Sequence, residues 1–135
     1  MNTKKFIITS LVVFVVYEIL NYLIHSLILM GAYQATMNLW RTDMNSIMWI
    51  MWLGDLVKAF VFVYIFTKGI ENKGWMEGLR YGFWIGLYVS IGMGFGTYVT
   101  QPFPFSLALQ WFIFGIIQLM ICGAVAALLY KPAKK

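Results

Sequence analysis

The sequence has few charged residues and almost no cysteine or histidine, and each shortage excludes a class of protein. Charged residues make up 11% of the 135 positions and apolar residues 61%, which excludes an ordinary soluble domain. Aromatic residues reach 19%, a share that excludes a disordered chain. With Cys122 as the single cysteine and His25 as the single histidine, the chain can build neither a disulfide framework nor a site of several cysteines or histidines. An integral membrane protein remains, with residues 1–135 as one small domain.

Four apolar stretches are long enough to cross a bilayer core of about 30 Å, which needs roughly 20 helical residues. They predict an all-α fold, a bundle of four transmembrane helices whose connecting loops are too short to hold a soluble domain. We expect the first stretch to be retained as a helix, because its apolar run is longer than that of a signal peptide. The predicted spans are residues 6–29, 45–66, 76–99 and 106–129.

Positive charges gather on one side of this arrangement and predict its orientation. The two chain ends and the second loop hold eight of the ten cations, whereas the opposite side has Arg41, which is offset by Asp43. Because cytoplasmic loops are rich in lysine and arginine, we expect both termini in the cytoplasm and the protein in a bacterial-type inner membrane. The eight cations are Lys4, Lys5, Lys68, Lys73, Arg80, Lys131, Lys134 and Lys135.

Three ionisable residues lie inside the predicted spans, where an ionised group costs about 2.5–3.5 kcal/mol at the helix centre. Glu18 is roughly 18 Å from the start of the first span and Asp55 roughly 15 Å from the start of the second, so both lie near the middle of the membrane. Lys58 follows Asp55 by three residues on the same helix face, which lets a neutral pair enter the membrane. We expect the first two spans to lie side by side, with Lys58 between the two carboxylates, because lipid cannot satisfy these groups.

Glu18 also begins a polar stripe on the first span. Asn21 and His25 follow at steps of three and four residues, so these side chains share one helix face. Gln118 and Ser90, in the fourth and third spans, lie at a similar depth and can join the same layer. Two roles for this layer remain open: a hydrogen-bonded cluster that fixes helix register, and a site that binds a proton or substrate.

Three roles remain open for His25: an interfacial hydrogen bond, a proton relay and an intersubunit metal ligand. The candidate proton- or substrate-binding residues are Glu18, Asn21, His25, Asp55, Lys58 and Gln118.

The third span carries a small residue at every fourth position, a spacing that forms a groove for the close approach of another helix. The fourth span has small residues of its own at Gly115, Gly123 and Ala127. We therefore expect a tight pair of these two spans, or a glycine-zipper surface through which copies of the chain form an oligomer. The predicted packing residues are Gly78, Gly82, Gly86, Ser90 and Gly94.

Two known families share single features with the chain. The pair Met44 and Met48, with glycines four residues apart in the third span, resembles the spacing in eukaryotic-type copper transporters. That family has three spans and a methionine-rich outer domain, both of which differ from this sequence, so we predict no metal site and no cofactor.

The position of Glu18 resembles that of the membrane carboxylate in small multidrug-resistance transporters. Asp55, Lys58 and the one-sided loop charges depart from that family, and we assign the chain to neither.

The charges near the middle of the membrane favour a small proton-linked transporter or permease, with Glu18 and Asp55 as proton acceptors and Lys58 as their counter-ion. The main alternative is a non-catalytic accessory or assembly subunit of a larger membrane complex, docked through its glycine face. A lipid- or quinone-binding protein, and a membrane enzyme with Glu18 and Asp55 as an acid–base pair, are weaker alternatives. Expected partners are membrane lipids and other copies or subunits in the membrane, and the scattered basic residues predict no nucleic acid.

Overall fold

The computed structural model describes residues 1–131, and these residues form an all-α structure. Within them, four helical segments are long and apolar enough to cross a membrane. At about 1.5 Å per residue, each is longer than the roughly 30 Å of a bilayer core. The prediction of a multi-pass membrane protein with four helical spans is therefore confirmed, and no predicted bound is wrong by more than three residues. The observed spans are Thr3–Ile28, Met44–Gly69, Trp75–Thr100 and Phe105–Leu129.

The first span is not a uniform α-helix. It begins as α1 (Thr3–Asn21), where the Asn2 side chain accepts a hydrogen bond from the Lys5 amide and caps the helix. It continues as a π-helical segment, Tyr22–Ile28, and a short helix, α2 (Met30–Ala35), then turns the chain. π-Helical turns are rare and occur frequently at functional sites.

The other three spans differ in regularity. The second is one continuous helix, α3 (Met44–Gly69). The third consists of α4 (Trp75–Ile91), a second π-helical segment (Gly92–Gly96) and α5 (Thr97–Thr100). The fourth is the long helix α6 (Phe105–Leu129).

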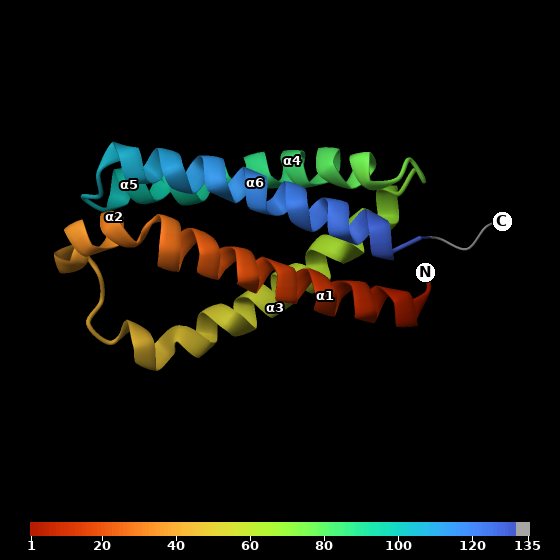
Figure 1. Cartoon of the computed structure of the whole chain (residues 1–135), viewed down its shortest axis with the longest axis horizontal. Helices are drawn as coiled ribbons and strands as arrows, with labels where there is room; N and C mark the ends of the chain where they lie inside the picture. Colours follow the sequence, from red (N-terminus) through yellow and green to blue (C-terminus); the bar gives the residue numbers. More distant parts are fainter. Residues whose placement is uncertain (132–135) are drawn as a thin grey trace.

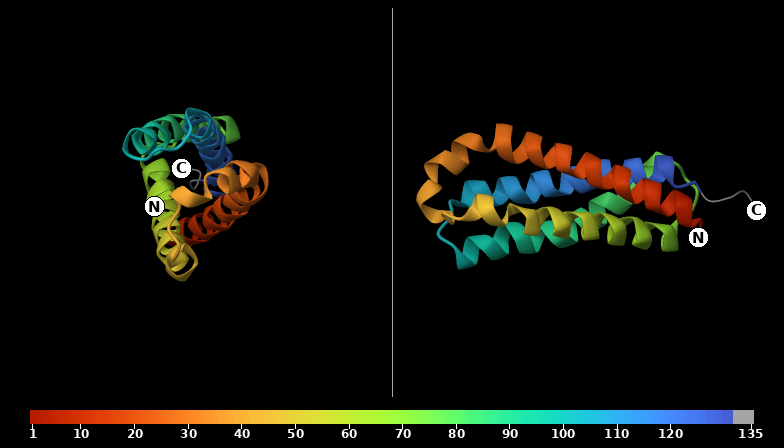
Figure 2. Two further views of the ribbon diagram at one scale, coloured as in Figure 1. Left: turned by 90° about the vertical axis from the view of Figure 1, so that its left-hand side faces the viewer. Right: turned by 90° about the horizontal axis from the view of Figure 1, so that it is seen from below.

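The four spans form an antiparallel bundle with the start of the first and the end of the fourth at one end (Figures 1 and 2). There the Asn2 amide donates to the Tyr130 hydroxyl at 3.3 Å, and Lys5 Nζ donates to the Lys131 carbonyl oxygen at 2.9 Å. We call this the terminal end, and the opposite end, which carries α2, the distal end. Helix α1 lies between α3 and α6, so it can join them through its side chains.

Helices α4 and α6 approach each other backbone to backbone. A Cβ atom on Gly78 would overlap the Gly123 carbonyl, and one on Gly82 would overlap the Leu119 carbonyl. Gly115 leaves the matching space on α6, where it faces the Ser90 side chain. Such close approach is possible only where small residues face the partner helix. The third-span glycines that face α6 are Gly78, Gly82, Gly86 and Gly94.

Two apolar clusters fill the bundle and leave a layer between them. The cluster toward the terminal end, which we call the terminal core, has Val13, Val63, Phe66, Cys122 and Ala126 at its centre. The cluster toward the distal end, which we call the distal cluster, contains Ile24, Leu29, Phe103 and Leu107, with Tyr33, Trp40 and Trp111 packed against it. The layer between these clusters contains Asn21, Asp55 and Gln118.

Candidate functional site

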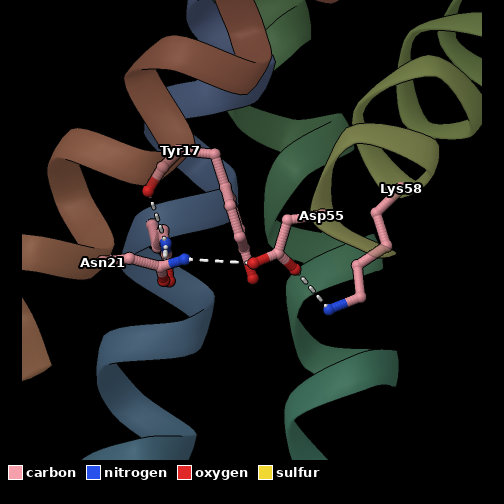
Figure 3. Close-up of polar contacts among 5 residues, drawn as sticks. Tyr17, Asn21, Asp55 and Lys58 are labelled. Atoms are coloured by element: carbon pink, nitrogen blue, oxygen red, sulfur yellow. Dashed lines mark hydrogen bonds and ion pairs between the residues drawn. The ribbon is translucent and has the colours of Figure 1, made fainter. Parts of the chain in front are cut away.

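A chain of polar side chains joins α6, α1 and α3 near the middle of the bundle. Gln118 on α6 donates from Nε2 to Asn21 Oδ1 at 2.7 Å and to the Tyr17 carbonyl oxygen at 3.2 Å. Asn21 Nδ2 on α1 in turn donates to Asp55 Oδ2 on α3 at 3.5 Å. Lys58 Nζ completes the chain with a 2.8 Å ion pair to Asp55 Oδ1 (Figure 3). We call Gln118, Asn21, Asp55 and Lys58 the polar chain.

The direction of each hydrogen bond in this chain follows from its neighbour. Because Asn21 Oδ1 accepts from Gln118, the amide nitrogen of Asn21 must face Asp55. Asp55 therefore receives a donor on each carboxylate oxygen, one from Asn21 and one from Lys58. Both oxygens of Asp55 are thus satisfied by neighbouring side chains.

Lys58 lies at the edge of the bundle and not in its interior. The Asp55 side chain is 3% exposed, whereas that of Lys58 is 59% exposed. Figure 3 shows Lys58 on the side of Asp55 that faces away from Asn21. Side chains on a helix lean toward its N-terminus, and Lys58 accordingly reaches back along α3 to Asp55. The expectation that Lys58 lies between two carboxylates is wrong in this respect, because Lys58 forms an ion pair with Asp55 alone among the described residues.

Glu18 lies beside the polar chain, with its carboxyl group close to that of Asp55. Its Oε1 atom is buried and has no hydrogen-bond partner among the described residues. The one nearby ammonium group pairs with Asp55, so an ionised Glu18 would have no cation of its own among the described residues. A proton on Glu18 would remove that unmatched charge and give the carboxyl group a donor of its own. We call Glu18 and the polar chain together the central site.

Tyr17 is a neighbour of the central site that the sequence analysis missed. Figure 3 shows its ring extending toward Asp55, and its phenol group lies within electrostatic reach of Asp55 and Glu18. The signal that could have found it is helical spacing, because Tyr17 precedes Asn21 by four residues and so shares its helix face.

The structure places His25 in the distal cluster, one turn beyond the polar chain. Its Nδ1 atom contacts the Tyr33 hydroxyl, and the two rings stack with centroids 5.9 Å apart. The Tyr33 oxygen accepts a hydrogen bond from Trp111 Nε1 at 2.8 Å, which leaves the Tyr33 O–H free to donate to His25. Burial raises the pKa of Tyr33, so the phenol keeps this proton at neutral pH. This geometry fits the interfacial hydrogen bond that was one of the roles open for His25.

Ser90 does not join the polar chain, although its depth in the third span is compatible with that role. It packs in the interface of α4 and α6, opposite Gly115, and no hydrogen bond in the described structure joins it to the polar chain. Its small side chain serves the close contact of these two helices.

A buried acid at the terminal end also escaped the sequence analysis. Glu77, in the first turn of α4, accepts hydrogen bonds from the backbone amides of Glu71 and Lys73, the latter at 2.8 Å. The loop needs this support because Asn72 and Gly74 have positive φ angles of 61° and 77°. Glu77 therefore fixes the turn between α3 and α4 and takes no part in the central site.

The residues that the structure describes contain no group of three or more histidine, cysteine, aspartate or glutamate side chains that could hold a metal ion. Comparison of the chain with protein-family models, with curated proteins and with solved structures gave no match. The central site is therefore the feature of the molecule that points to a function.

Proposed function

We propose that the protein is a small proton-linked transporter in which Glu18 binds and releases the proton. The proposal is based on a difference in hydrogen bonding between two neighbouring carboxyl groups. Asp55 has a donor on each oxygen, whereas Glu18 beside it has a buried oxygen without a partner. Burial of an ionisable group at this depth in a membrane costs free energy, and such groups usually have a functional role.

The two carboxyl groups differ in the part that they play under this proposal. Asp55 pairs with Lys58 and sets the local field, whereas Glu18 takes up and releases the proton. Asn21 and Gln118 are positioning residues, because they orient the donor that faces Asp55. The initial hypothesis that both carboxyl groups accept protons is thereby narrowed to one of them.

Proton flux into proteoliposomes tests the proposal. Vesicles would carry an entrapped pH-sensitive dye, and a potassium gradient with valinomycin would drive proton entry. We expect flux above that of protein-free vesicles for the wild type, and flux at the protein-free level for Glu18→Gln. Glu71→Gln is the matched control, because Glu71 is an exposed acid in the loop before α4. Equal flux for wild type and Glu18→Gln, or wild-type flux no higher than that of empty vesicles, would contradict the proposal.

We also place the terminal end in the cytoplasm of a bacterial-type inner membrane. The support is the positive charge of this end, where Lys4, Lys5, Lys68, Lys73 and Arg80 lie. Lys134 and Lys135, which the orientation argument also used, lie outside the described residues. Cys122 is buried, so cysteines introduced as Asn72→Cys and Thr42→Cys can report on the two sides. An impermeant maleimide added to intact cells should label the second variant and not the first, and the reverse result would invert the topology.

An accessory subunit of a larger membrane complex is the second candidate function. The glycine face that was expected to dock such a partner is covered by α6 of the same chain. The exposed apolar residues 49–53 on α3 are the feature that favours a partner instead. Purification in mild detergent discriminates between the two candidates: a stoichiometric companion protein favours the accessory subunit, and a preparation of this chain alone favours the transporter.

A further inference from the structure

The distal half of α3 stands away from the rest of the bundle, as the two directions of view in Figures 1 and 2 agree. The buried residues of α3 begin at Asp55, and the others follow it toward the terminal end. Residues 49–53 cover all directions around the helix, and each of them is about half exposed. No side of this segment is therefore packed as a bundle helix is. We call residues 44–54 the α3 arm.

The central site is covered along the axis of the bundle. Toward the terminal end it meets the terminal core, in which Val13, Val63 and Cys122 are almost completely buried. Toward the distal end it meets the distal cluster, where Tyr33, Trp40 and Trp111 pack against one another. The side that faces the α3 arm lacks such a cover, since Lys58 is 59% exposed there. A molecule that approaches this side from outside the bundle therefore reaches the central site at Lys58.

Lys58 is the charged group of the central site that such a molecule meets first. An ammonium group has three N–H bonds, and the structure gives one contact of this group, to Asp55. Gly54 adds no side chain at the position one helical turn before Lys58. The side chains that flank it along α3 are apolar and exposed: Trp49, Ile50, Trp52, Leu53, Val57 and Val61. A cation surrounded by exposed apolar surface is complementary to an anion attached to an alkyl chain.

We infer that the α3 arm and Lys58 form a lateral binding site for an acidic amphiphile with one alkyl chain. The anionic head group pairs with the Lys58 ammonium, and the alkyl chain lies along the apolar side chains of α3. This inference rests on the proposed function, because it uses the proton site at Glu18 to balance charge.

The charge balance gives the site its dependence on pH. An anion at Lys58 adds a negative charge next to two carboxyl groups, Glu18 and Asp55, which a low-dielectric site disfavours. Uptake of one proton by this carboxyl pair restores the balance, so amphiphile and proton bind together. The affinity then rises by about tenfold for each unit by which the pH falls, as long as one proton is taken up. The titratable groups around the centre on the described elements are Tyr17, Glu18, His25, Asp55, Lys58 and Cys122.

Retention of hexadecyl sulfonate by the protein in nanodiscs of neutral phospholipid tests the inference. A sulfonate stays ionised throughout the useful pH range, so its pH dependence reports on the protein. We expect retention above that of empty nanodiscs, stronger at low pH, and weaker retention of hexadecanol and of hexadecyltrimethylammonium. Lys58→Met should weaken binding by about tenfold or more, which matches the loss of one hydrogen bond to a charged group. Lys58→Arg should restore it, and Lys68→Met, which removes a cation at the terminal end, should leave it unchanged.

Two further variants distinguish a loss of sulfonate binding from a loss of folding. The double variant Asp55→Asn with Lys58→Met removes both members of the ion pair together, and we expect it to fold and to lose sulfonate binding. Asp55→Asn alone keeps the ammonium and removes one carboxyl group, so it should bind the sulfonate more tightly at neutral pH with a weaker pH dependence. A purely structural role for the Asp55–Lys58 pair predicts no gain in binding for this variant.

The outcomes separate this inference from the proposed function. Equal retention by wild type and Lys58→Met, or preference for the trimethylammonium probe, overturns the lateral acidic site even if Glu18-dependent proton flux is observed. Sulfonate binding that depends on Lys58 but is independent of pH overturns the proton linkage. Binding that depends on both Lys58 and pH, in a protein without proton flux, supports the site and contradicts the transporter.

Discussion

Gln118 on α6 donates a hydrogen bond to Asn21 on α1 across 2.7 Å, and this contact determines which end of the Asn21 amide faces Asp55. Gln118 never touches Asp55 in the polar chain, yet it orients the donor that does. Removal of Gln118 would leave Asn21 free to turn its oxygen toward a carboxylate. The electrostatic environment on α3 is therefore set in part by a residue two helices away.

The first prediction concerns this contact. Gln118→Leu should destabilise the protein by about 1–2 kcal/mol, because it removes a buried hydrogen bond between membrane helices. Unfolding by dodecyl sulfate in mixed micelles, followed by circular dichroism, measures the change. Gln110→Leu is the control, since it makes the same substitution on the same helix outside the polar chain. Equal stability of the two variants would show that the contact does not hold the helices together.

The second prediction tests the contact between α4 and α6. Gly82→Ala should destabilise the bundle by about 1–3 kcal/mol, because its Cβ would overlap the Leu119 carbonyl and force the helices apart. Gly92→Ala should be neutral or stabilising, since a Cβ at Gly92 meets nothing within 4 Å and alanine favours helix. Thermal unfolding in detergent compares the two variants, and a Gly82→Ala protein as stable as the wild type would contradict the observed packing.

The third prediction concerns the hydrogen bonds of the distal cluster. Tyr33→Phe removes the acceptor of the Trp111 N–H and the hydroxyl that contacts His25. We expect a loss of about 1–3 kcal/mol, the cost of leaving buried polar groups without partners. Tyr98→Phe makes the same change at an exposed residue of α5 and should have little effect. Near-ultraviolet circular dichroism should change for the first variant alone, and unchanged spectra for both would argue against this arrangement of Tyr33.

The fourth prediction uses the loop between the first two spans. The side-chain hydrogen bonds from Arg41 hold the pKa of Asp43 below its usual value. A lowered pKa contributes stability that is present above the unfolded value and is lost as the pH falls through the folded value. Arg41→Gln should therefore raise the pKa of Asp43, as measured by an NMR titration of its carboxyl carbon. Lys73→Gln should leave Asp43 unchanged and raise the pKa of Glu71, and an Asp43 titration that is insensitive to Arg41→Gln would rule out the pairing.

The spans were predictable because long apolar runs are an unambiguous signal, and the mid-span position of Glu18, Asn21, Asp55 and Gln118 followed from counting residues. Rotation about each helix axis was harder to predict. The depth of Ser90 in its span is compatible with the polar layer. The orientation of α4 about its own axis instead turns the Ser90 side chain toward Gly115. Depth alone also put Lys58 inside the bundle, although the crossing of α3 over α1 leaves it at the edge. Single-sequence periodicity cannot give these rotations, because the spans are apolar on nearly every side.

The π-helical segment Tyr22–Ile28 had no signature in the sequence. A π-helical turn adds a residue to the helix and so changes the direction of the side chains that follow it. His25 lies within this segment and reaches Tyr33 on α2, a helix that was expected to be a loop. The contact between His25 and Tyr33 therefore depends on a local feature of the backbone.

The proposed function requires Glu18 to be the carboxyl group of the central site that takes up a proton. Infrared difference spectroscopy of the reconstituted protein, taken between high and low pH, measures this directly through the carbonyl band of a protonated carboxyl group. We predict one such band for the membrane-embedded acids, which disappears in Glu18→Gln and persists in Asp55→Asn. A band that survives Glu18→Gln and disappears in Asp55→Asn would contradict the account.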